Sequence, residues 1–175
     1  LPRAQSFAAQ LEGLLRKRDP GARVVNAGVS GDTTAGGLAR LPRLLDQLER
    51  LPDLCLVELG ANDAIRGIDP ATTRSNLDVI LSVLGKRDVS VLLCGMIAPP
   101  FLGSYALRFN AIFPEVAAQH GIPLYPFFLA GVAGEQSLTL ADGLHPNGRA
   151  VEIVARRILP HVEEALCGSA DIMAA

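Results

Sequence analysis

Three near-continuous apolar runs constrain the fold of this chain more than any other feature. They lie at Leu54–Leu59, Val89–Met96 and Ile122–Phe128. Apolar runs without polar alternation predict strands that are buried on both faces, and strands that alternate with helices predict a parallel sheet. The sequence therefore predicts an α/β layered domain with a central parallel sheet.

Segments with helical spacing of apolar residues lie between these runs and at both ends of the chain. Asp69-Pro70 is a typical helix start and Gly85 a typical stop. A further short buried strand is expected at Arg23–Ala27. The expected helices are Ser6–Arg18, a helix opening near Thr34 that Pro42 kinks or divides, the segment from Asp69 to Gly85, the segment from Ser104 to Gly121, and a closing helix around Ala150–Val162.

The length of the chain bounds the number of domains, and its charge excludes some classes of binding partner. A chain of 175 residues suits one domain, expected at 1–166, and Cys167–Ala175 is expected to be a tail that is disordered or added in expression.

Sixteen basic and eighteen acidic residues give a formal charge of -2, so no basic field would attract nucleic acid or an anionic membrane. No apolar run is long enough for an integral membrane segment. Cys55 and Cys94 are expected in the core.

Polar clusters follow the expected strands. They are Ser30–Asp32, Gly60–Asp63 and Asp142–His145. In parallel sheets of this kind the functional loops lie past the carboxyl ends of the strands. The sequence therefore predicts that the three clusters meet at one edge of the sheet and form an active site.

The residue types in these clusters suit acyl transfer. Asp142 can accept a hydrogen bond from Nδ1–H of His145 and leave Nε2 free as a base. The Gly31 N–H and the Asn62 carboxamide are candidate donors to an oxyanion. The sequence is equally compatible with Gly31 as an ordinary turn glycine and with Asn62 in an Asx turn that satisfies its own loop.

Three segments that contain these clusters resemble, in this order, blocks II, III and V of the SGNH (GDSL) hydrolases: Ser30–Thr33, Gly60–Asp63 and Asp142–Pro146. Val24–Ala27, Leu38–Pro42 and Val57–Leu59 resemble the bacterial branch of thioesterase I, lysophospholipase L1 and arylesterase-like enzymes. The resemblance implies a flavodoxin-like three-layer α/β/α fold with sheet order 2-1-3-4-5, no metal or other cofactor, and a small-molecule acyl ester or thioester as substrate. It assigns Gly31 and Asn62 as oxyanion donors, Asp142 as the orienting acid and His145 as the base.

Two departures from the family pattern stand out. Ala61 occupies a position where the family often has glycine, and no serine lies in a Gly-Asp-Ser setting. The nucleophile is therefore unidentified, and we expect it upstream of Leu1 on a first strand that lies in the middle of the sheet. Without that strand, buried backbone groups would lose partners at a cost of ~1–3 kcal/mol each.

Other readings stay open at this point. A domain of the same fold without a nucleophile would bind ligands and not catalyse, and a carbohydrate-ester deacetylase would share the same motifs. Phosphate binding at Gly28–Gly37 is disfavoured because no Walker or dinucleotide glycine pattern is present. His120 and His161 suit a helix end and a surface position. The resemblance implies a periplasmic or secreted protein, and a cytoplasmic one is compatible with the absence of a visible signal peptide.

Overall fold

The computed structural model describes residues 2–141 and 145–168, which fall into two compact units. The sheet unit comprises Val29–Phe128 together with the chain from Glu164 onward. The helical unit comprises the chain through Gly28 together with Leu129–Glu163. The expected single domain at 1–166 stays a prediction.

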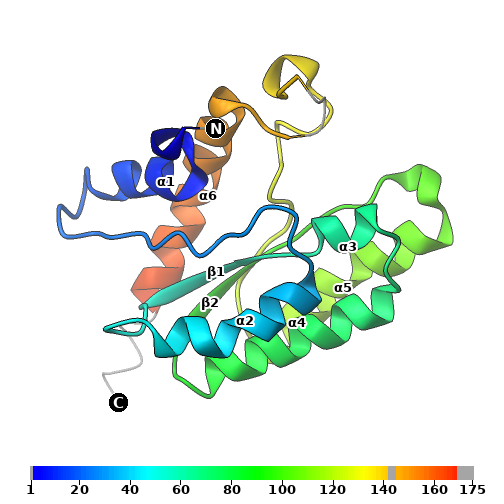
Figure 1. The fold of residues 1–175 in the computed structure, drawn as a ribbon, viewed down its shortest axis with the longest axis horizontal. Helices are drawn as coiled ribbons and strands as arrows, with labels where there is room; N and C mark the ends of the chain where they lie inside the picture. Colours follow the sequence, from blue (N-terminus) through cyan, green and yellow to red (C-terminus); the bar gives the residue numbers. More distant parts are fainter. Residues whose placement is uncertain (1, 142–144, 169–175) are drawn as a thin grey trace. The chain divides into compact units, whose positions relative to one another are not determined.

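The sheet unit is built on three parallel strands in the order β1-β2-β3 (Figure 1). They are β1 (Leu54–Glu58), β2 (Ser90–Cys94) and β3 (Leu124–Tyr125). The apolar runs and their parallel direction are therefore confirmed. β3 is shorter than the apolar run around it, because Pro123 and Pro126 flank it and cannot donate ladder hydrogen bonds.

Helix α4 (Pro70–Gly85) packs between α2 (Thr34–Asp46) and α5 (Ser104–His120), and α4 and α5 contact the strands (Figure 1). The Asp69 side chain caps α4 by accepting from the Ala71 N–H at 3.0 Å, and α5 ends at Gly121 in the left-handed conformation. These boundaries agree with the sequence. The core between helices and sheet includes Leu77, Leu84, Leu93, Phe109, Phe113 and Val116.

Short helical segments complete the sheet unit. They are α3 (Ala61–Ile65), directly after β1, and the 3-10 segment η2 (Pro100–Leu102). The sequence predicted a loop at Gly60–Asp63, so the helical turn of α3 is a correction. Gly60 makes it possible, because its φ of 112° turns the chain sharply at the end of β1.

The helical unit contains η1 (Arg3–Gln5), α1 (Phe7–Leu15), η3 (Gln136–Leu138) and α6 (Gly148–Gly168), whose last residues belong to the sheet unit. Ser6 caps α1 by accepting from the Ala9 N–H at 3.3 Å. Arg18 donates to Glu163 of α6 at 2.5 Å. Because α6 runs through Gly168, the first residues of the expected tail are helical, and 169–175 lie outside the described residues.

The expected strand at Arg23–Ala27 is wrong for the described structure. This segment pairs with no strand, and Val25 is 62% exposed. The Val24 N–H donates instead to the Glu12 carboxylate at 2.8 Å. A strand needs a hydrogen-bonded neighbour along its edge, and the described sheet offers this segment none.

Among the helices of the described residues, none has the length and apolar character needed to cross a membrane.

Candidate active site

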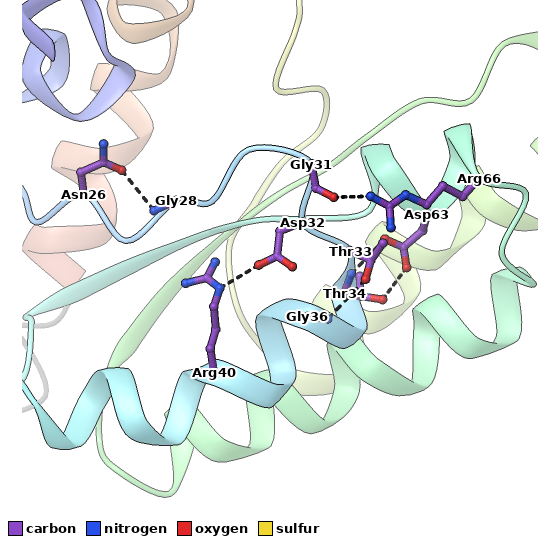
Figure 2. A network of polar contacts seen from close by, with 10 residues as sticks. All are labelled: Asn26, Gly28, Gly31, Asp32, Thr33, Thr34, Gly36, Arg40, Asp63 and Arg66. Atoms are coloured by element: carbon purple, nitrogen blue, oxygen red, sulfur yellow. Dashed lines mark hydrogen bonds and ion pairs between the residues drawn. The ribbon is translucent and has the colours of Figure 1, made fainter.

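Gly31 lies in an exposed turn just before α2 (Figure 2). The Asp32 N–H closes this turn by donating to the Val29 carbonyl at 3.2 Å. Gly31 has φ 79°, in the left-handed region, and the nearest atom to a Cβ placed there is Nη2 of Arg66 at 3.9 Å. Backbone conformation and not crowding therefore requires glycine at this position. Its exposure lets a ligand approach the peptide N–H.

The turn leads directly into the capped start of α2. Thr33 accepts from the Gly36 N–H at 3.3 Å, and Asp32 forms an ion pair with Arg40 at 2.7 Å. A Cβ on Gly36 would lie 1.8 Å from Oδ1 of Asp32, so glycine leaves the room that the Asp32 carboxylate occupies. The acid next to Gly31 is thus directed toward α2 (Figure 2).

Asn62 lies in the first turn of α3, and its side chain is half-buried. Its carboxamide makes no hydrogen bond with any described residue. The Asx turn considered from the sequence is therefore absent here. A carboxamide held on a helical turn with its N–H groups uncommitted can donate to a bound ligand.

Asp63, the next residue, is fully buried and accepts three hydrogen bonds. Thr34 donates from its N–H at 2.9 Å and from its hydroxyl at 2.5 Å, and Thr73 of α4 donates from its hydroxyl at 3.1 Å. Asn76 also donates to the Thr34 hydroxyl oxygen at 3.0 Å. These bonds join α3 to the starts of α2 and α4. Asp63 belongs to the Gly60–Asp63 motif, but the sequence indicated no role for it.

Arg66 makes a second connection between the two clusters. Its Nη2 donates to the Gly31 carbonyl oxygen at 2.7 Å (Figure 2). The Gly31 turn and the α3 segment of Asn62 are therefore joined at two points, through Asp63 and through Arg66. The prediction that these clusters meet at one end of the sheet is supported for Gly31 and Asn62.

His145 lies in the helical unit, on an exposed bend between η3 and α6. Its carbonyl oxygen accepts from the Leu140 N–H at 2.7 Å, and Thr139 and Pro146 form an isolated antiparallel bridge. Asn147 caps α6 by accepting from the Ala150 N–H at 3.1 Å, and its Nδ2 donates to the Ser137 carbonyl at 2.9 Å. The backbone at His145 and directly after it is therefore anchored.

Asp142, the expected partner of His145, lies outside the described residues, and its orienting role stays a prediction. Within the described parts of the chain, no group of three His, Cys, Asp or Glu side chains forms a metal-binding arrangement.

Comparisons with known proteins are consistent with this arrangement. Residues 2–153 match the model of the GDSL-like lipase/acylhydrolase family. The chain is 41% identical to Esterase TesA of Pseudomonas aeruginosa, over 95% of this chain and 82% of that protein. It is 38% identical to an arylesterase of Vibrio mimicus, over 93% of this chain and 82% of that protein.

Solved structures give the same result. The crystal structure of TesA superposes with a TM-score of 0.87 at 40% identity, covering 94% of this chain and 91% of that one. AlinE4, an esterase of the SGNH-hydrolase family, superposes with a TM-score of 0.78 at 44% identity, covering 95% of this chain and 88% of that one. The chain therefore belongs to the GDSL-like lipase/acylhydrolase family, the SGNH hydrolases.

Proposed function

We propose that this chain is a serine hydrolase that cleaves carboxylic acyl esters and thioesters through an acyl-enzyme. His145 is the general base, Asp142 orients it, and the Gly31 N–H and the Asn62 carboxamide hold the oxyanion. The reaction class is supported by the family and by the names of similar proteins, which are esterase, arylesterase and thioesterase. The residue roles are our proposal.

The reaction follows from these roles. His145 Nε2 takes the proton of a serine hydroxyl while the serine oxygen forms a bond to the substrate carbonyl carbon, and the carbonyl π electrons move onto its oxygen. Gly31 and Asn62 donate hydrogen bonds to that oxyanion. The intermediate collapses, the C–O or C–S bond breaks, and the leaving group takes the proton from His145. Water then repeats the sequence and releases the acid.

One observation carries the proposal for the oxyanion hole: the exposed turn of Gly31 and the α3 segment that carries the uncommitted Asn62 carboxamide are hydrogen-bonded to each other. Preorganised neutral donors of this kind stabilise charge that develops only in the transition state.

We place the nucleophilic serine on a segment that precedes Leu1 and pairs with β1. In the described sheet β1 has β2 as its neighbour on one side, and most of its apolar side chains are half-buried, whereas those of β2 are buried. A further strand along β1 would bury them. Intact mass and N-terminal sequencing of the natural protein, followed by mapping of a fluorophosphonate-labelled peptide, test this placement.

Asn62→Ala in the complete protein tests the oxyanion assignment. Loss of one donor should lower kcat for a short p-nitrophenyl ester by ~10²–10³-fold with little change in KM. Asn110→Ala is the matched control, because Asn110 bonds the backbone N–H and carbonyl of Ala98 and should affect stability more than kcat. A kcat for Asn62→Ala within twofold of the unsubstituted protein would remove Asn62 from the mechanism.

The alternatives give different results in the same assays. A ligand-binding domain without a nucleophile would neither turn over the ester nor react with a fluorophosphonate. A carbohydrate-ester deacetylase would prefer acetylated sugars to acyl thioesters at equal concentration. We also propose a periplasmic or secreted location, which fractionation of the source cells checks.

A further inference from the structure

Gly31 needs support from outside its own turn if it is to act as a donor. The turn is exposed, and a glycine backbone has more conformational freedom than that of any other residue. A catalytic hydrogen-bond donor must nevertheless be held close to its productive geometry before the reaction begins. The question is which residue limits the movement of the Gly31 peptide.

Arg66 contacts the backbone of both proposed donors. Its side chain donates to the Gly31 carbonyl at 2.7 Å, and its backbone N–H donates to the Asn62 carbonyl at 3.0 Å. Arg66 is the residue that ends α3, one helical turn after Asn62. A single residue is thus hydrogen-bonded to the main chain of both Gly31 and Asn62.

The charges around Arg66 favour this contact. Asp32, the carboxylate nearest to Gly31 in sequence, is paired with Arg40 at 2.7 Å. Arg66 forms no ion pair with any described residue, so its guanidinium is available to the Gly31 carbonyl. A charge-assisted hydrogen bond to a peptide oxygen is stronger than a neutral one. It also leaves a positive charge beside the turn where negative charge would develop.

The helix α3 that precedes Arg66 is itself held in place by buried hydrogen bonds. Asp63 lies inside α3, is fully buried, and accepts both the N–H and the hydroxyl of Thr34. Thr34 follows Gly31 by three residues, so Asp63 holds the far end of the turn while Arg66 holds Gly31 itself (Figure 2).

We propose that Arg66 is a positioning residue of the oxyanion hole, which holds the Gly31 peptide in place through its carbonyl oxygen. This inference rests on the proposed function. Arg66 acts through Gly31 and not on the substrate, so its loss should reduce transition-state stabilisation and leave substrate binding unchanged.

Arg66→Met in the complete protein is the test, because methionine keeps an unbranched side chain and removes the guanidinium. We expect kcat for a neutral p-nitrophenyl ester to fall about tenfold, less than for direct loss of a donor, with KM within twofold. Arg66→Lys should recover part of kcat, since an ammonium can donate one bond. Arg108→Met is the matched control, because Arg108 is also exposed and lies 3.9 Å from Asp69.

A second measurement follows the turn without activity. Amide hydrogen exchange at Asp32, whose N–H closes the Gly31 turn, should become faster in Arg66→Met and stay unchanged in Arg108→Met. The melting temperature should stay the same in both variants.

Three outcomes overturn the inference about Arg66 alone: an unchanged kcat with unchanged exchange, an equal fall in kcat for Arg108→Met, or an effect confined to KM for anionic esters. The last would mark Arg66 as a substrate contact. If the unsubstituted complete protein fails to hydrolyse any ester or thioester, the proposed function and this inference fall together.

Discussion

Asn62 and Asp63 are neighbours in sequence and have opposite environments. The Asp63 carboxylate is buried and accepts three hydrogen bonds, while the Asn62 carboxamide has no partner among the described residues. Successive side chains on a helix point about 100° apart, so the turn of α3 separates them. The polar motif predicted a site at these positions. It did not predict that Asp63 would stabilise the local structure while Asn62 would be left available to a ligand.

The cysteines differ in the same way, and their reactivity is testable. Burial raises the pKa of the Cys55 thiol to about 11 and that of Cys94 well above its ordinary value, whereas Cys167 is exposed on α6. A raised pKa keeps a thiol protonated, and the protonated form does not react with alkylating agents. Iodoacetamide at pH 8 should therefore modify Cys167 in the native protein, and Cys55 and Cys94 only after unfolding.

Peptide mapping by mass spectrometry with and without urea measures this order. Equal native rates at Cys94 and Cys167 would contradict the assignment of Cys94 to the core.

At the scale of the element, α3 organises the site although it is only five residues long. Gly60 starts it, and a Cβ there would lie 3.1 Å from the ring of Phe113, so the start of α3 packs closely on α5. The hydrogen bonds of Asp63 then connect it to α2 and α4. So short a helix has little intrinsic stability and depends on these tertiary contacts.

Asp63→Asn should destabilise the protein, because an amide presents one acceptor oxygen where the carboxylate accepts from three donors. A buried donor left without a partner costs ~1–3 kcal/mol, so we expect the free energy of unfolding to fall by about 2 kcal/mol or more. Urea unfolding followed by circular dichroism measures it.

Asp78→Asn is the control for that measurement. Asp78 also accepts from two side chains, Gln119 and His120, but its own side chain is 40% exposed. Exposed polar pairs contribute ~0–1 kcal/mol, so the control should lose clearly less stability. If the free energy of unfolding fell by similar amounts in the two variants, the hydrogen bonds of Asp63 would contribute no more to stability than those of an exposed carboxylate.

At the scale of the whole molecule, the proposed mechanism needs residues from both compact units. Gly31 and Asn62 belong to the sheet unit, and His145 belongs to the helical unit. Substitutions in the sheet unit and in the helical unit therefore test the proposed roles separately.

His145→Ala in the complete protein should lower kcat/KM for a short p-nitrophenyl ester by at least about 10³-fold, because the variant lacks the base proposed to take the serine proton. Fluorophosphonate labelling should be lost as well. Circular dichroism should be unchanged, since the backbone contact of the His145 carbonyl and the contacts of Asn147 remain in the variant. His120→Ala, which loses only the contact with Asp78, should retain labelling and hydrolysis. Retained activity in His145→Ala would exclude His145 as the base.

Local patterns predicted the elements that depend on local causes. Continuous apolar runs predicted β1 and β2, helical spacing predicted α1 and α5, and Asp69-Pro70 and Gly85 predicted the start and end of α4. The same patterns failed at Arg23–Ala27, which has the residues of a strand but no neighbour in the described sheet. They also missed α3, because five residues are too few for a helical periodicity to appear.

The sequence by itself determined the class of fold and the family, because apolar periodicity and motif order are properties of neighbouring residues. It also indicated the need for glycine at position 31, where the structure has φ 79°. Only the tertiary structure decided which polar groups meet. Thr34 bonds Asp63 across 29 positions, and Gly31 bonds Arg66 across 35. Such pairs have no local signature, since any buried carboxylate or exposed guanidinium bonds the partner that packing brings within reach.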